Sequence, residues 1–114
     1  MEIKTNSFEV EYDKEINTVR FQGSLRLSGM DEYAPIVELL NQIADQNPAN
    51  LTLDLRALEF LNSSGINVLS KFVIRVRQNK EMGLTVKGSE EIAWQTKSLK
   101  NLQRLMPSLT LELQ

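Results

Sequence analysis

The residues best suited to chemistry lie in one short turn, Asn62-Ser63-Ser64-Gly65, between a predicted strand and a predicted helix. The first backbone N–H groups of a helix have no intrahelical acceptor, and the aligned peptide dipoles leave a partial positive charge there. A phosphate on Ser64 is therefore compatible with a folded helix, and it would add about −1.5 to −2 charge units. The turn thus predicts an exposed helix start at which a modified serine changes the local charge.

The same turn also suits a purely structural role. Asn62 or Ser63 can cap the helix, which contributes about 1 kcal/mol of stability. Gly65 can allow the turn to pack closely against its neighbours. Taken alone, the four residues favour capping over a functional surface.

Composition excludes several kinds of catalytic site. The 114-residue chain has no cysteine and no histidine, which rules out disulfides, thiolate metal sites and a Ser-His-Asp triad. The sequence also contains no Gly-rich phosphate loop and no cluster of metal ligands. An enzyme would depend on scattered Asp, Glu, Lys and Tyr residues, with Asp54 as its first candidate. We therefore expect a protein that binds rather than catalyses, with no cofactor and no metal.

Charge and hydropathy predict neither a nucleic-acid partner nor a membrane protein. The net charge is −2, whereas non-specific nucleic-acid binding usually needs a basic surplus. The longest mostly apolar stretch, residues 66–76, is interrupted by polar residues and is too short to cross a bilayer. Residues 1–7 contain no long apolar run, so they predict no secretory signal. The expected location is the cytoplasm.

Hydrophobic periodicity predicts the elements that position the turn. Alternation predicts strands near residues 8–12, 18–21, 51–55, 84–87 and 109–113. Helical spacing predicts three helices, which begin near residues 28–31, 62–65 and 89–91. The first is expected to end before Asn47-Pro48 and the third before Pro107. The polar residues 95–98 are candidates for an interruption of the third helix.

The order of these elements is β-β-α-β-α-β-α-β, in a chain of one-domain length. Alternating strands and helices indicate right-handed crossovers and a largely parallel sheet, which the initial hairpin makes mixed. We therefore predict a single α/β domain over residues 1–114, with about five strands and three main helices. Asp54 is expected to accept hydrogen bonds from nearby loop N–H groups, and Trp94 is expected to pack in the core.

The segment from residue 51 to residue 76 resembles the signature of STAS domains in anti-sigma-factor antagonists. In that family, a strand, an aspartate, an apolar loop residue and an Asp-Ser-Ser-Gly turn lead into an apolar helix. The element order agrees as well, so the resemblance covers nearly the whole chain and favours a functional surface at the turn. It implies a STAS-like domain that is phosphorylated on Ser64, with Ser63 as the second choice. It also implies two partners, namely a kinase-like anti-sigma factor that binds the unphosphorylated form and a PP2C-type phosphatase that restores that form.

Two residues depart from the family pattern. Asn62 stands where the family has aspartate, and Arg26, in the run Gly23-Ser24-Leu25-Arg26, stands where the family often has an acidic residue. In the family this loop lies beside the serine turn, so both changes would make the site more positive. Arg26 would then hold a phosphate on Ser64, or the site would lack the acidic groups that a kinase recognises and Ser64 would stay unmodified. A solvated loop charge is a third interpretation of Arg26.

A partner-binding surface is predicted around the turn and along the second helix. Polar residues of that helix share one face at helical spacing, and a mixed polar and apolar face suits an interface as well as an ordinary solvated surface. The predicted contact residues are Arg26, Asn62, Ser63, Ser64, Asn67, Lys71 and Arg75. The leading hypothesis is a phosphorylation-controlled binding module of the anti-sigma-factor antagonist type. The alternative is a STAS-like scaffold or anion-sensing domain without a phosphate switch.

Overall fold

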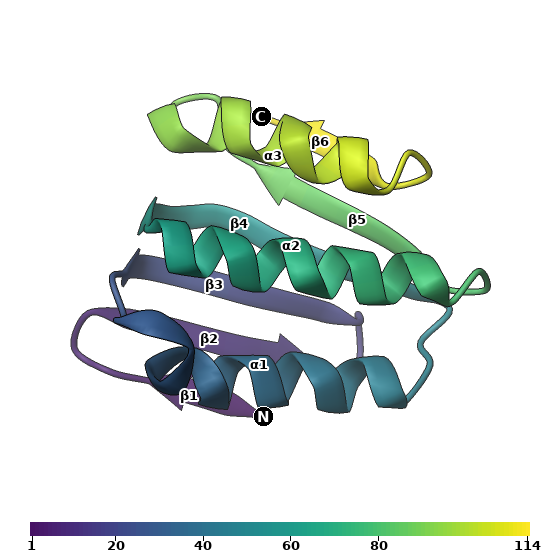
Figure 1. Ribbon diagram of the computed structural model, residues 1–114, viewed down its shortest axis with the longest axis horizontal. Helices are drawn as coiled ribbons and strands as arrows, with labels where there is room; N and C mark the ends of the chain where they lie inside the picture. Colours follow the sequence, from purple (N-terminus) through teal and green to yellow (C-terminus); the bar gives the residue numbers. More distant parts are fainter.

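Six strands form one mixed sheet in the spatial order β1-β2-β3-β4-β5-β6. The computed structural model describes residues 1–114 (Figure 1). The strands are β1 Glu2–Lys4, β2 Phe8–Asp13, β3 Thr18–Leu25, β4 Asn50–Leu61, β5 Gly83–Gly88 and β6 Thr110–Leu113. The pairs β1–β2 and β2–β3 are antiparallel, whereas β3–β4, β4–β5 and β5–β6 are parallel. The predicted mixed, mostly parallel sheet is therefore confirmed.

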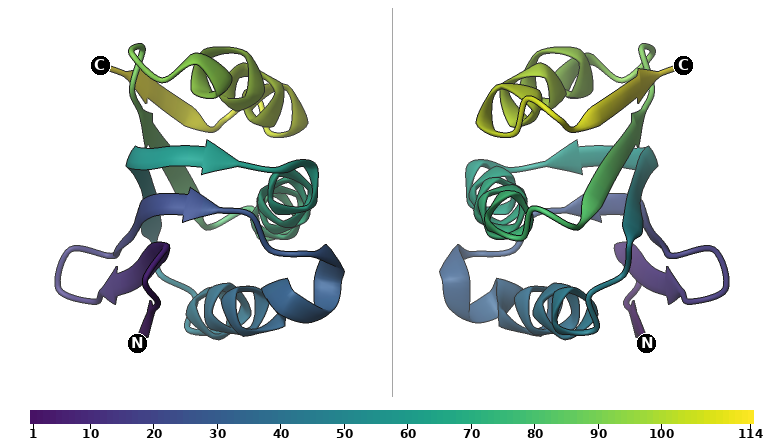
Figure 2. Two further views of the ribbon diagram at one scale, coloured as in Figure 1. Left: turned by 90° about the vertical axis from the view of Figure 1, so that its left-hand side faces the viewer. Right: turned by 90° about the vertical axis from the view of Figure 1, so that its right-hand side faces the viewer.

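Three helices cover one face of this sheet. They are α1 Gly29–Asp45, α2 Ser63–Gln78 and α3 Ala93–Leu105, and Figure 2 shows all three on the same side of the strands. Alternate strand residues point toward the helices and, with the apolar helix faces, form a core of 29 buried residues. None of the helices combines the length and apolar character that a membrane span requires.

The other face of the sheet is polar. One row of residues in register crosses the strands, and its members are Glu11, Arg20, Asp54, Lys87 and Glu112. From β2 to β6 the charges alternate in sign, so these neighbouring strands place opposite charges side by side, whereas at the β1 edge Glu2 pairs with Glu11. Figure 2 shows no element covering this face.

Two strands differ from the sequence prediction. The short strand β1 is additional and pairs with β2 at the edge of the sheet. Strand β4 was predicted near residues 51–55, but it runs on to Leu61 and thus leads directly into the serine turn. Its register with β3 shifts twice, so bulges accommodate the irregular stretch.

The third helix also differs from the prediction. It begins at Ala93 rather than near Ser89, because Ser89 Oγ accepts the Glu91 N–H in a preceding turn. The polar residues 95–98 do not interrupt it. Gln95 is fully buried, and its side-chain amide donates to Leu55 O at 2.6 Å and to Leu58 O at 2.9 Å. A buried polar side chain is tolerated in this helix because its partners are backbone groups of β4.

Candidate functional site

Asn62 joins three segments at the start of α2. Its Oδ1 accepts hydrogen bonds from Gly65 N at 3.0 Å and from the Tyr33 hydroxyl at 2.7 Å, while its Nδ2 donates to Leu27 O at 2.8 Å. Its backbone N–H donates to Leu25 O at 3.3 Å. The predicted capping role of Asn62 is thus confirmed, and the same side chain also holds α1 and the loop that follows β3.

This geometry requires an amide rather than a carboxylate. An ionised aspartate has acceptors only, so it would place an oxygen against the carbonyl of Leu27 in the position that Nδ2 of Asn62 now occupies. The departure from the family's aspartate therefore has a structural consequence, because the amide fixes the loop that carries Arg26.

Gly65 allows α2 to start directly against Tyr33. A Cβ at this position would collide with the Leu61 side chain and would stand 2.7 Å from the Tyr33 oxygen. Close packing at the turn, the role predicted for Gly65, is thus confirmed.

The two serines lie at the surface end of this arrangement. Ser63 is exposed and Ser64 is partly buried. Their backbone N–H groups have no hydrogen-bond acceptor. The Asn62 side chain accepts from the Gly65 N–H instead, and the Asn62 carbonyl accepts from the Ile66 N–H. The first turn of α2 contains no acidic residue. The helix start therefore offers two free donors and partial positive charge to solvent.

Arg26 lies in the loop that Asn62 holds, but its side chain has a different neighbour from the predicted one. The loop backbone is next to the turn through Leu25 and Leu27. The Arg26 guanidinium carbon stands 4.5 Å from the centre of the Phe60 ring, and Phe60 is 39% exposed. This cation–π contact was missed from the sequence, because it depends on the pairing of Ser24 with Phe60 across β3 and β4.

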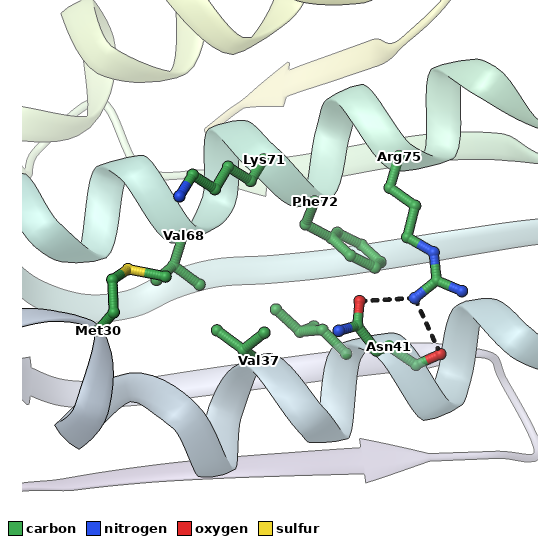
Figure 3. Close-up of a pocket in the computed structure, with 8 residues that line it drawn as sticks. Met30, Val37, Asn41, Val68, Lys71, Phe72 and Arg75 are labelled. Carbon is green, nitrogen blue, oxygen red and sulfur yellow. Dashed lines mark hydrogen bonds between the residues drawn. The ribbon is translucent and has the colours of Figure 1, made fainter.

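The predicted contact residues of α2 fall into two groups. Asn67 and Lys71 are exposed. Arg75 instead bridges α2 to α1. Its Nη1 donates to Asn41 Oδ1 at 2.6 Å (Figure 3), and its Nη2 forms an ion pair with Asp45. The structure therefore brings Ser64, Asn67 and Lys71 to the surface of one helix, while Arg75 makes contacts within the domain.

Tyr33 is a site residue that sequence reasoning assigned only to an apolar helix face. It is 1% exposed, and its hydroxyl reaches Asn62. Burial raises the pKa of Tyr33, so the phenol remains a neutral donor. The residue type alone could have indicated this contact, because a tyrosine hydroxyl that is buried on an apolar helix face generally requires a hydrogen-bond partner.

Asp54 lies on the polar face of the sheet and forms no part of the serine site. Its Oδ1 accepts from the backbone N–H and the Nε of Arg56, and its Oδ2 accepts from Nη2 at 2.8 Å. These side-chain hydrogen bonds from Arg56 are the main reason that the pKa of Asp54 lies below its ordinary value. The expected structural role for Asp54 therefore agrees with its contacts.

The sheet order, the three helices on one face and the serine turn after β4 define a class of protein. A model of the STAS domain matches residues 7–87, and the chain belongs to this family. The resemblance predicted from the sequence is thus confirmed.

Individual relatives give a finer comparison. The chain is 32% identical over 56 residues to the anti-sigma-F factor antagonist RsfB of Mycobacterium tuberculosis, in strains CDC 1551 / Oshkosh and ATCC 25618 / H37Rv. This match covers 49% of the chain and 46% of RsfB, so the chain spans about half the length of the curated relatives it matches.

Solved structures share the fold over a longer range. A chain in the crystal structure of the diguanylate cyclase SiaD with its activator SiaC, from Pseudomonas aeruginosa, has a TM-score of 0.75 at 13% identity, and the match covers 100% of this chain and 99% of that one. An anti-sigma factor antagonist from Mycobacterium paratuberculosis has a TM-score of 0.70 at 22% identity, covering 94% and 88%. At these identities the likeness concerns the fold alone.

Proposed function

We propose that the domain is a regulatory binding module of the anti-sigma-factor antagonist type, and that phosphorylation of Ser64 controls its docking. The observation that carries this proposal is the start of α2, where Ser63 and Ser64 lie at the surface with free backbone N–H groups. The local match to RsfB adds support, since that relative is named an anti-sigma-F factor antagonist. The activity proposed is binding, not catalysis.

The partner proposed is a kinase-like anti-sigma factor, with a PP2C-type phosphatase to remove the phosphate. Both come from the family resemblance, and a cytoplasmic location fits them. Ser63, Ser64, Asn67 and Lys71 would touch the partner, because their side chains are not engaged by the rest of the domain. Asn62, Arg26 and Arg75 would instead shape the surface through the contacts described above.

The physical basis of the switch is electrostatic. A phosphate on Ser64 meets free N–H groups and no acidic residue within its own helix turn, so the domain can stay folded. At a docked surface the added charge needs solvation or a basic group from the partner. A loss of about 4 kcal/mol of binding free energy would weaken affinity roughly a thousandfold.

The test is a pull-down from source cells with the wild type, Ser64→Glu and Ser64→Ala, followed by phosphosite mapping of the domain. We expect the wild type and Ser64→Ala to capture a kinase-like ATPase that Ser64→Glu loses, while the circular dichroism spectra of all three agree. Ser108→Glu is the matched control, since it adds the same charge at an exposed serine in the turn after α3, outside the proposed contact residues, and it should still capture the ATPase. Capture of the same ATPase by Ser64→Glu at undiminished affinity would contradict the proposal.

A scaffold or anion-sensing domain without a phosphate switch is the second candidate. Asn62 and Arg26 favour it, because they remove negative charge from the neighbourhood of the turn. The fold is also shared with a structure whose title names a cyclase and its activator rather than a sigma-factor system. This candidate predicts no phosphate on Ser64 in cells, and a substantial Ser64 phosphopeptide in mass spectra would remove its support.

A further inference from the structure

A groove of about 200 Å³ runs along the surface between α1 and α2. Apolar side chains from both helices, Val37 and Leu40 on α1 and Val68 and Phe72 on α2, line it together with Met30, Asn41, Lys71 and Arg75. Figure 3 shows Met30 reaching from the start of α1 toward Val68, so that one end of the groove is closed by an apolar side chain. Met30 is 44% exposed, so part of the apolar lining is open to solvent.

The groove and the serine turn belong to one surface. Ser64, Val68, Lys71 and Arg75 follow one another at intervals of four, three and four residues, which places them on the same face of an α-helix. On α2 the lining of the groove therefore extends from Val68, one helical turn after Ser64, to Arg75, which pairs with Asp45. From Ser64 to Arg75 the helix rises by about 16 Å, which matches about three turns of a second helix.

The charges along the groove have one sign. No carboxylate lines it, and the ammonium group of Lys71 takes part in none of the four ion pairs of the domain. The Arg75 charge is already compensated by Asp45. Figure 3 shows Lys71 extending along α2 toward the end at which Ser64 lies. The Lys71 ammonium group is thus a single uncompensated positive charge beside the apolar lining of the groove.

We propose that this groove receives an amphipathic helix of the partner, whose apolar side chains enter between α1 and α2 and whose acidic residue pairs with Lys71. A helix fits because its side chains at intervals of three and four residues can occupy a groove bounded by two helices. An acidic helix fits because Lys71 is the charge left without a counterion. The inference rests on the proposed function and names the part of the partner that docks.

The proposal also explains the direction of the switch. A phosphate on Ser64 would stand at one end of the groove and would carry the same sign as the acidic residue of the docked helix. Like charges brought together at an interface oppose association. Phosphorylation therefore releases the partner by repulsion along the groove, with no change of fold required.

The first test identifies what touches the groove. The photo-crosslinking residue p-benzoylphenylalanine replaces Met30, and the same residue replaces Gln22, an exposed position on β3 with a side chain on the polar face of the sheet. After irradiation of the complex captured by the wild-type surface, we expect a crosslink from position 30 to a peptide with net negative charge and apolar residues at helical spacing. A basic peptide, a peptide without that spacing, or equal crosslinking from position 22 would overturn the proposal.

The second test is a charge exchange. Lys71→Glu should weaken binding of the captured partner by about tenfold or more, and changing the crosslinked acidic residue to lysine should restore the affinity. Lys100→Glu, the same change at an exposed site on α3, should leave the affinity unchanged.

If Ser64→Glu releases the partner but Lys71→Glu does not, the groove proposal fails and the proposed function stands. If only Lys71→Glu releases it, the phosphate switch fails and the groove stands. A wild type that captures no partner contradicts both.

Discussion

Asn62 connects residue chemistry to the geometry of the whole site. One amide accepts two hydrogen bonds and donates a third, and these bonds tie α2 to Tyr33 and to the loop after β3. The position of that loop therefore depends on a single side chain. Capping could be predicted from the sequence because it is local, whereas the bonds to Tyr33 and Leu27 span 29 and 35 residues.

Replacement of Asn62 by aspartate tests this dependence. Asn62→Asp keeps the cap but loses the donor to Leu27 O and places two oxygens together, so we expect a loss of about 1–2 kcal/mol in the free energy of unfolding. Asn62→Ala should lose more, because the cap is lost as well. Urea unfolding followed by circular dichroism ranks the wild type and the two variants by their free energy of unfolding. An Asn62→Asp variant as stable as the wild type would show that the amide donor is dispensable.

At the scale of elements, α3 is anchored to β4 by Gln95. Its amide reaches two carbonyl groups of the irregular part of that strand, and its Oε1 accepts the Ser89 N–H. The packing of α3 on the sheet thus depends on polar contacts as well as on its apolar face. The same residue fixes the stretch of β4 that precedes the serine turn.

Gln95→Leu keeps a similar volume but removes every one of these bonds. We expect it to destabilise the domain by about 2–3 kcal/mol, because Leu55 O and the Ser89 N–H lose their side-chain partner and Leu58 O keeps only the Trp94 indole N–H. Lys97→Leu, at an exposed position of the same helix, is the matched control and should change stability by no more than about 0.5 kcal/mol. Equal stabilities for the two variants would mean that water replaces the glutamine at no cost.

These examples show which features periodicity can and cannot predict. The alternating residues of β2 and the apolar stripe of α2 carried enough information to place both elements and the buried core. The end of β4 did not, because bulges break the alternation and the register depends on pairing with β3. The exposure of the serine turn could be predicted, but the position of the Arg26 side chain could not, since Phe60 reaches it only through the folded sheet.

At the scale of the whole molecule, the two faces have different physical characters. One face carries the helices, the groove and the serine turn, while the other carries the row of alternating charges. In that row Asp54 is the buried member, with 9% exposure, and it is held by Arg56. Stability against acid should therefore depend on the open face, away from the proposed docking surface.

The pH dependence of stability tests this separation. Arg56 lowers the pKa of Asp54 in the folded state, so the unfolded chain takes up the proton first as the pH falls. The stability that the pair contributes is present above about pH 4 and is lost as the pH falls through the folded pKa. Asp54→Asn should thus be less stable than the wild type by about 1–2 kcal/mol at pH 7, and this difference should shrink at pH 3.

Urea unfolding at both pH values measures the effect. Arg56→Gln removes the same pair from the other side and should give a similar profile. A difference between Asp54→Asn and the wild type that stays constant from pH 7 to pH 3 would assign the loss to packing rather than to the charge.

Trp94, the only tryptophan, donates its indole N–H to the carbonyls of Leu58 and Glu59 and packs against the core. Those carbonyls belong to the last part of β4, four and three residues before Asn62. The indole is thus an intrinsic fluorescence probe. Its emission maximum and intensity should change when a bound partner shifts β4, the strand that precedes the serine turn. Titrations can then be followed with unlabelled material.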